Sequence, residues 1–463
     1  MTTINDLDRK TLVHPFAHLA DHDAGNTPSR VIKKGKGIRI YDTDGIELID
    51  AFSGLYCVNI GYGNEAVADA IAEQARELAY YHAYAGHGSE PSIKLSDEIL
   101  KWYGPGMARV FYGLSGSDAN ETQAKIVWYY NNVLGRPAKK KIISRLRGYH
   151  GATVISGSMT GLPFYHTAFD MPCGPILHTT NPHYYFEAED GMTEAEFSKK
   201  CARDLEEMIL REGPDTVAAF IGEPMLGTGG IITPPENYWA EIQAVLNKYD
   251  ILLIADEVVC GFGRTGENFG SHLYGMKPDL ITIAKGLTSA YLPLSGSIVG
   301  DKVWDVLKQG SEKYGPFSHG YTYTAHPLCA AAGLANLKVL KDNNIVANAK
   351  DTGAYFNSEL RKAFSQHPLV GEVRGQGMLG ALEFVQDRSQ KQRFDAALKV
   401  GAQVSAATLK RGIIARAMPH GDILGFAPPL ITTKEDVDHI IKTVAEAVNE
   451  VTDTLTAQGV KLA

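Results

Sequence analysis

Short, continuous hydrophobic runs dominate the middle of the chain. The runs cover residues 217–222, 251–255, 280–283 and 295–299, with shorter ones at 110–112 and 141–144. Polar turns bound each run, which is typical of central strands that are covered on both faces. Helical spacing of hydrophobic residues separates most of the runs. The pattern therefore predicts an α/β protein with a mostly parallel sheet and crossover helices.

The two ends of the chain follow another pattern. Residues 31–50 alternate hydrophobic and polar positions around Asp44-Gly45, a dipeptide that predicts a tight hairpin turn. We expect the first thirty residues, which are polar, to be irregular. Later elements are predicted as follows: a helix over 65–80, one or two helices over 327–365, a glycine-punctuated strand over 373–384, and amphipathic helices over 392–411 and 434–456.

These patterns predict two domains. Residues 61–325 contain the hydrophobic strands and form the large domain. Residues 326–463 form a smaller α+β domain, which the N-terminal segment 1–60 completes with its hairpin.

Composition and charge narrow the class of protein. Of 463 residues, 44% are hydrophobic and 21% charged, which excludes a largely disordered chain. The net charge of −8 argues against a nucleic-acid partner. The five cysteines are widely spaced, so we expect neither disulfides nor a metal site. No signal peptide or membrane span is visible, and we expect a cytoplasmic protein.

Chemistry-bearing residues follow the predicted strands, where ligands of open α/β sheets bind. Lys285 directly follows a hydrophobic strand. A lysine at a strand end is often only a surface residue, but loss of hydration here favours the neutral amine, which attacks carbonyl groups. Asp256 follows another strand. It is either a helix cap or salt-bridged carboxylate, or an anion that keeps a pyridine nitrogen protonated.

Two further features fit a flat, phosphorylated ligand. The run GSDAN at 116–120 opens a helix with small residues, so backbone N–H groups are available to an anion, although a plain capped helix has the same pattern. Tyr149 in RLRGYHG either packs in the core or stacks on a flat ring. Taken together, a lysine, a carboxylate, an anion cup and an aromatic ring match the needs of pyridoxal 5′-phosphate (PLP).

The chain also resembles a known protein family. Its motifs are similar to those of the class III (ω-) aminotransferases of PLP fold type I over essentially the full length, above all the amine–pyruvate and ω-amino acid–pyruvate aminotransferases. The matching segments are SGSDANET (115–122), RGYHG (147–151), IGEPMLGTGGIITPP (221–235), LLIADEVVCGFGRTG (252–266), DLITIAKGL (279–287) and GYTYTAHP (320–327).

The resemblance implies roles for the cofactor residues. Lys285 would form the Schiff base with PLP and shuttle the substrate proton. Asp256 would pair with the pyridine nitrogen, with Val258 against one ring face and Tyr149 against the other. The remaining contacts implied by the resemblance are Ser115, Gly116 and Ser117 at the phosphate, His150 beside Tyr149, Glu223 near the ring hydroxyl, and Thr322 at the phosphate of a neighbouring subunit.

Substrate recognition is also implied by the resemblance. Arg416, in a segment similar to the family's mobile arginine segment, would bind the carboxylate of pyruvate or an amino acid. Phe16 would enter a neighbouring site, and Tyr56 and Tyr84 would line the pocket beside Tyr149. Tyr56 stands where related enzymes often have tryptophan, which makes a small polar amine the more plausible donor. Arg374, in a glycine-rich turn, is interpreted as mainly structural.

The function expected from this resemblance is ping-pong transfer of an amino group from an ω-amino acid or primary amine to pyruvate, giving alanine. Active sites would be shared in a homodimer, or in a tetramer of such dimers. An aminomutase or a decarboxylating aminotransferase would carry the same cofactor motifs. A nicotinamide dehydrogenase would need a G-x-G-x-x-G motif, which the chain lacks. An inactive binding protein is disfavoured because Lys285 and Asp256 are both present.

Overall fold

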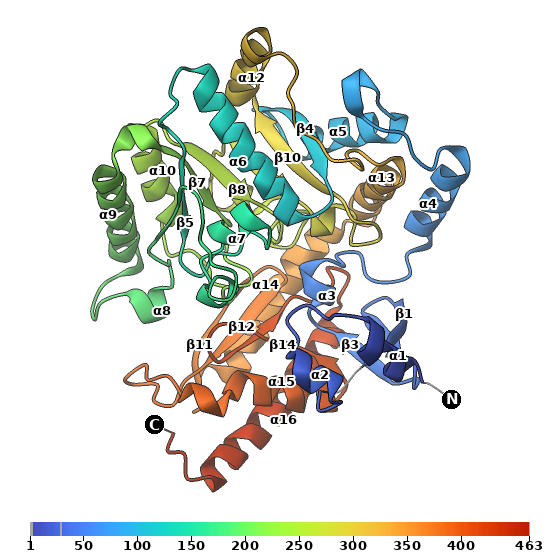
Figure 1. Cartoon of the computed structure of the whole chain (residues 1–463). Helices are drawn as coiled ribbons and strands as arrows, with labels where there is room; N and C mark the ends of the chain where they lie inside the picture. Colours follow the sequence, from blue (N-terminus) through green and yellow to red (C-terminus); the bar gives the residue numbers. More distant parts are fainter. Residues whose placement is uncertain (1–2, 28–29, 463) are drawn as a thin grey trace.

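The computed structural model describes residues 3–27 and 30–462. Within them, the largest sheet has seven strands in the order β4-β10-β9-β8-β7-β5-β6 (Figure 1). β10 pairs antiparallel with both of its neighbours, and the other pairs are parallel, as the sequence predicts. The strands are β4 (Met107–Gly113), β5 (Lys141–Arg145), β6 (Ile176–Thr179), β7 (Val217–Gly222), β8 (Leu252–Asp256), β9 (Leu280–Ile283) and β10 (Ser295–Gly300).

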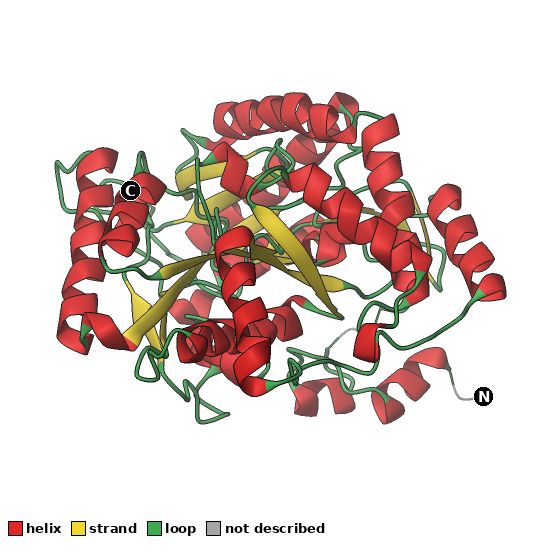
Figure 2. Ribbon diagram, turned by 90° about the horizontal axis from the view of Figure 1, so that it is seen from above, coloured by secondary structure: helices red, strands yellow, loops and turns green. Residues whose placement is uncertain are grey.

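Helices cover both faces of this sheet (Figure 2). Side chains alternate between two cores: Leu253 and Ala255 of β8 join one, while Leu252 and Ile254 join the other. This alternation is why each strand reads as a continuous hydrophobic run. The covering helices are α4 (Glu65–Glu77), α5 (Glu90–Tyr103), α6 (Gly116–Val133), α7 (Val154–Met159), α9 (Glu194–Glu212), α10 (Tyr238–Lys248), α12 (Asp301–Tyr314) and α13 (Pro327–Asp342), with short α3 (Ser53–Tyr56), α8 (Tyr184–Glu187) and α11 (Gly270–Leu273) nearby in sequence.

The two ends of the chain meet in smaller sheets (Figure 1). One has the order β1-β2-β3-β13 and the other β11-β12-β15-β14. Ile49 of β3 pairs with Ile413 of β13, so the N-terminal strands lie beside C-terminal elements. The domain boundaries at 60 and 325 stay a prediction. The elements are β1 (Ile32–Lys36), β2 (Arg39–Asp42), β3 (Glu47–Asp50), α14 (Ile345–Phe364), β11 (Val370–Gln376), β12 (Leu379–Phe384), α15 (Val400–Lys410), β13 (Ile413–Ile414), β14 (Arg416–Ala417), β15 (Ile423–Phe426) and α16 (Lys434–Ala457).

Three expectations about local structure were wrong. The N-terminal segment is not irregular: it contains α1 (Ile4–Thr11), which a Thr3–Asp6 capping box begins, and α2 (Leu19–Asp23). The strand expected over 373–384 is a hairpin of β11 and β12, because Gly377 at φ +56° turns the chain. The helix expected from 392 begins only at Val400, after the left-handed residue Lys399.

Other expectations are confirmed. Residues 327–365 form two helices, α13 and α14, which Asn344 separates in a left-handed conformation. The turn at Asp44-Gly45 joins β2 to β3. Among the described residues, no helix combines the length and the apolar character that a membrane span requires.

Candidate active site

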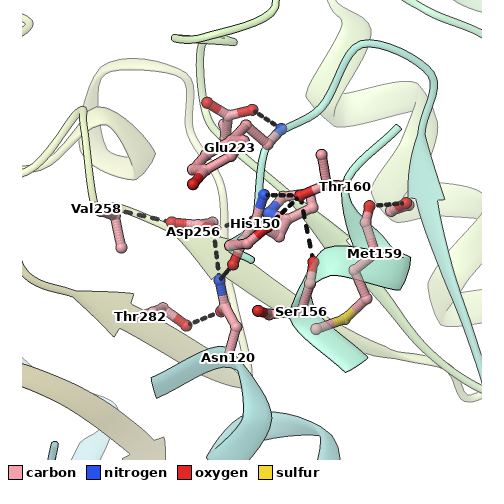
Figure 3. A network of polar contacts seen from close by, with 12 residues as sticks. Asn120, His150, Ser156, Met159, Thr160, Glu223, Asp256, Val258 and Thr282 are labelled. Atoms are coloured by element: carbon pink, nitrogen blue, oxygen red, sulfur yellow. Dashed lines mark hydrogen bonds and ion pairs between the residues drawn. The ribbon is translucent and has the colours of Figure 1, made fainter. Parts of the chain in front are cut away.

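Polar side chains gather where the central strands of the large sheet end. Asp256 is the last residue of β8, Glu223 directly follows β7, and Lys285 lies two residues beyond β9. Tyr149 and His150 lie in the loop after β5. Because parallel strands end at one edge of the sheet, these residues converge there, as the sequence predicts. Figure 3 shows three of them, Glu223, Asp256 and His150, close together.

Asp256 is the centre of a buried hydrogen-bond network (Figure 3). Its Oδ2 accepts from His150 Nδ1 at 2.8 Å and from Asn120 Nδ2 at 2.8 Å. Its Oδ1 accepts from the backbone N–H of Val258 at 3.1 Å. The side-chain amide oxygen of Asn120, Oδ1, in turn accepts from the Thr282 hydroxyl at 2.7 Å. The three donors to Asp256 hold its carboxylate in one orientation, and only 2% of the residue is exposed.

Glu223 fastens the Tyr149 loop to the end of β7. Its two carboxylate oxygens accept from the backbone N–H groups of Tyr149 at 3.0 Å and Gly227 at 2.7 Å. Burial raises the pKa of Glu223, while these N–H donors oppose the rise. The loop is also held from behind, where the Thr160 hydroxyl accepts from the His150 N–H at 2.9 Å.

The N-terminus of α6 forms a small anion cup. Ser115 caps the helix by accepting from the Asp118 N–H, so the N–H groups of Gly116 and Ser117 have no acceptor within the helix. A Cβ on Gly116 would lie 3.0 Å from a methyl carbon of Val258, so the Val258 side chain would have to shift by a few tenths of an ångström to accommodate it. The Ser117 hydroxyl accepts from the Ala152 N–H at 3.1 Å.

Lys285 faces a buried aromatic wall. Its Nζ lies 5.3 Å from the ring centroid of Tyr56, and its own backbone has a φ of +44°. Tyr56 is 1% exposed, and burial raises its pKa. The Phe52 ring lies 4.5 Å from Tyr56 and 5.5 Å from the Arg416 guanidinium. The lysine and the arginine are thus linked by one pair of aromatic rings.

Tyr149 belongs to a second aromatic group. Its ring lies 5.3 Å from Tyr165, which in turn lies 4.9 Å from Phe16. Burial raises the pKa of Tyr149, and the positive charge of Arg416 opposes this rise. The family resemblance predicts that Phe16 enters a neighbouring site. In the structure, Phe16 packs against Tyr165 and Phe164 of its own chain.

Tyr84 and Thr322 do not join this group in the described chain. The exposed fraction of Tyr84 is 49%, and Thr322 is also exposed. The two lie near one another: the Thr322 carbonyl accepts from the Tyr80 hydroxyl at 2.6 Å, and a Cβ on Gly320 would lie 3.0 Å from the Tyr84 hydroxyl. They therefore form part of an exposed surface of the described chain.

Several site residues were not singled out from the sequence. Asn120 lies one helical turn after Gly116, within the quoted GSDAN run, but its distance from Asp256 in the chain hides their contact. Thr282 and Thr160 carry no motif of their own. Tyr165 could have been found only through its place in the aromatic-rich segment LPFYH.

The site has a buried carboxylate for a ring nitrogen, an anion cup and a lysine between aromatic rings, which together define an enzyme that uses a phosphorylated pyridine cofactor. A family model described as aminotransferase class-III matches residues 19–448. The chain therefore belongs to the class III aminotransferase family, and it is a PLP-dependent transaminase of fold type I.

Individual relatives support this assignment. The chain is 63% identical to the diaminobutyrate–2-oxoglutarate transaminase of Halomonas elongata, with 99% of each chain covered. It is 45% identical to gamma aminobutyrate transaminase 1, a mitochondrial protein of Solanum lycopersicum, covering 91% of this chain and 81% of that one. An omega transaminase from Pseudomonas jessenii, solved in complex with PMP, is 40% identical with a TM-score of 0.95, covering 98% of this chain and 99% of that one.

The geometry fits the cofactor of this family. Asp256 Oδ1 makes a single hydrogen bond among the described residues and can accept one more, from a ring N–H. The cup at Gly116 and Ser117 has the backbone donors that a phosphate needs. Nothing in the donor set opposes an anionic, aromatic ligand.

Proposed function

We propose that the enzyme transfers an amino group from an ω-amino acid or a small primary amine to pyruvate, by a ping-pong reaction that gives alanine. The observation that carries the proposal is the Arg416 guanidinium, which lies beside the aromatic wall of Lys285 and makes no ion pair with any described residue. An arginine in this state can bind one carboxylate of a small keto acid.

Other residues in the proposal hold the cofactor. Bound PLP would supply an electron sink for the bond that breaks at the substrate Cα. Asp256 would keep the ring nitrogen protonated, with Val258 on one ring face and Tyr149 on the other. Glu223 would fix the Tyr149 loop near the ring hydroxyl, with His150 behind it. Ser115, Gly116 and Ser117 would bind the phosphate at the helix N-terminus.

Lys285 is proposed to move the proton. Lys285 would hold the cofactor through its amine, and the same amine, once free and neutral, would be the base that takes the proton from the substrate Cα. The rings of Tyr56 and Phe52 exclude water on one side, because both are 1% exposed.

The choice of keto acid acceptor is argued from which arginine side chains already have hydrogen-bond partners. Arg374 is committed: it donates to the carboxylates of Glu372 and Glu383 and to the carbonyl of Gly230, and it is 4% exposed, which agrees with its structural interpretation. Arg264 is fully buried and donates to Asn59 and to the Pro428 carbonyl. Among Arg374, Arg264 and Arg416, only Arg416 has neither a carboxylate nor a carbonyl partner among the described residues, and one such arginine suits a monocarboxylate such as pyruvate.

A second candidate acceptor is 2-oxoglutarate. The relative from Halomonas elongata, 63% identical, is named for it. A dicarboxylate would need a second group of donors for its far carboxylate, which Arg416 alone does not provide. The tyrosine wall suits a polar donor, and the names of the relatives, diaminobutyrate and gamma aminobutyrate transaminases, agree with a donor that carries an ω-amino group.

We also propose that two copies share their active sites. The exposed surface of Tyr84 and Thr322 would face the neighbouring subunit's site, with Thr322 at its phosphate and Tyr84 at its pocket. Tyr56, Phe16 and Arg416 would contact the substrate within their own chain.

The test combines both halves of the reaction. Purified enzyme is given a panel of donors (2,4-diaminobutyrate, 4-aminobutyrate, β-alanine, taurine and simple amines) with either pyruvate or 2-oxoglutarate. We expect alanine from pyruvate at a kcat/KM at least tenfold above that for glutamate from 2-oxoglutarate. The reverse preference would refute the pyruvate proposal and leave the transaminase assignment intact.

A further inference from the structure

The N-terminal segment carries a group of side chains that the transaminase reaction does not use. Asp8 lies on α1, His14 in the following turn and His22 on α2. Their ligand atoms all lie within 4.8 Å of one another. His14 Nε2 is 2.8 Å from Asp8 Oδ1, and His22 Nε2 is 3.7 Å from Asp8 Oδ2. Two imidazoles therefore converge on one carboxylate.

His22 is the unusual member of the group. It is 8% exposed, yet its buried Nε2 makes no hydrogen bond. A buried polar atom left without a hydrogen-bond partner destabilises the folded protein. Its ring meets the His14 ring edge to face at 4.7 Å, so both rings are held with a nitrogen towards Asp8. A cation placed among these atoms would give His22 Nε2 the partner that it lacks.

We propose that Asp8, His14 and His22 bind a divalent transition-metal ion of the Zn²⁺ type. Two imidazoles and one carboxylate are ligands that Zn²⁺ accepts, with water in the remaining position. In a tetrahedral site with bonds of about 2.0–2.1 Å, neighbouring ligand atoms lie about 3.3 Å apart. The separations of 2.8 Å and 3.7 Å fall on either side of that value. Imidazole nitrogens disfavour Mg²⁺ and Ca²⁺.

Another group of the same residue types shows what excludes a metal. His183, Glu372 and Glu383 also have ligand atoms within 4.8 Å of one another. There the Arg374 guanidinium donates to both carboxylates, and His183 Nδ1 accepts from Arg147. Cations already neutralise that group, so a metal ion would be repelled.

The proposed site has a structural consequence for the active site. His14 lies only two residues before Phe16, whose backbone has a φ of +61° and whose ring packs against Tyr165. Tyr165 contacts Tyr149 in turn. An ion that ties α1, the His14 turn and α2 together would hold the backbone that presents Phe16 to this aromatic group.

The experiment measures Zn²⁺ binding to the chelator-treated holoenzyme by competition with a chromophoric chelator. We expect one saturable equivalent per chain. His22→Gln and Asp8→Asn each lose a ligand and should weaken binding by about 100-fold or more, since even supporting residues of metal sites are worth 10- to 100-fold. The matched controls are His18→Asn, which keeps an acceptor at the start of α2, and Asp23→Asn. Both controls should bind as wild type, and excess Mg²⁺ should not compete.

Proteolysis gives an independent readout. Trypsin cuts after Arg9 and Lys10, next to Asp8, when the segment opens. At a Zn²⁺ concentration 100 times Kd, the opened population and the cleavage rate should fall about 100-fold in wild type. Zn²⁺ should not protect His22→Gln. Absence of a saturable site in wild type, or equal affinity in wild type, His22→Gln and Asp8→Asn, would overturn the proposal. Cofactor absorbance and circular dichroism confirm that each variant is folded.

Discussion

The amide of Asn120 is expected to matter for catalysis although it contacts neither cofactor nor substrate in the proposal. Its Nδ2 donates to Asp256 Oδ2 at 2.8 Å and to the His150 carbonyl at 2.7 Å. Asn120→Ala removes both bonds in a fully buried position. Asp256 then loses one of its side-chain donors, and the proton that it would hold on the ring nitrogen is less stabilised.

The magnitude follows from these contacts. A hydrogen bond to a charged group contributes about 1.5–3 kcal/mol, and each 1.4 kcal/mol is about tenfold in rate. Asn120→Ala should therefore lower the rate of the first half-reaction by about 10- to 100-fold. Stopped-flow absorbance of the bound cofactor, mixed with a saturating amine donor, measures that rate directly.

Thr282→Val is the matched control. It removes only the 2.7 Å bond from the Thr282 hydroxyl to the Asn120 carbonyl oxygen and leaves both donors on Asp256. We expect a rate loss of less than about fivefold, since a neutral hydrogen bond contributes about 0.5–1.5 kcal/mol and acts here only through Asn120. If Asn120→Ala retains cofactor and reacts within threefold of wild type, the amide is only a packing residue and the reasoning fails.

Four further outcomes are expected. Lys285→Ala should abolish multiple turnover while the fold, followed by circular dichroism, persists; sustained turnover would remove the lysine from its role. Arg416→Ala should raise KM for pyruvate by about 10- to 100-fold, the worth of a bidentate carboxylate contact, with less than about threefold change for a neutral amine donor; equal changes would make the arginine structural. Mixing inactive Lys285→Ala and Thr322→Ala subunits, after dissociation and reassociation, should restore activity, because one site of each hybrid dimer is then intact; no recovery would argue against shared sites. Burial raises the pKa of Glu257 to about 7, above its unfolded value, so the folded state binds the extra proton. As pH rises from 4.5 to 7.5, the free energy of unfolding of wild type should therefore fall by up to about 3 kcal/mol relative to that of Glu257→Gln. Thermal melts at four pH values measure this stability difference, and a difference that stays constant with pH would contradict the prediction.

The elements that the sequence predicts well are those with one dominant periodicity. β7, β8 and β9 are buried on both faces, so their hydrophobic runs identify them to within a residue. β6 was missed, because two of its four residues are only partly buried and its hydrophobic run is short. The sequence pattern predicts one strand where the structure has the hairpin of β11 and β12, because glycine occurs both within the strands and at the turn.

The site residues also fall into two groups: those that the strand pattern predicts and those that it does not. Lys285, Asp256 and Glu223 were found because each follows a strand, and the parallel topology alone brings strand ends together. Arg416 is different: it comes from the short β14, and no local pattern places it beside Phe52. Only the family resemblance identified it. Asn120 and Thr282 were missed, since a hydrogen bond between residues 162 positions apart leaves no periodic trace in a single sequence.

This division has a consequence for specificity in the family. Asp256, at the end of β8, is held by three hydrogen bonds, so its geometry tolerates little change. The proposed pocket wall comes from other parts of the chain: Phe16 from the N-terminal segment, Tyr56 from the end of α3 with a φ of +65°, and Arg416 from the small sheet. Substitutions in these segments alter the pocket without disturbing the cofactor network. Donor and acceptor preference should therefore map to the pocket residues, and an exchange of Tyr56 for tryptophan should change kcat/KM between donors while leaving cofactor absorbance unchanged.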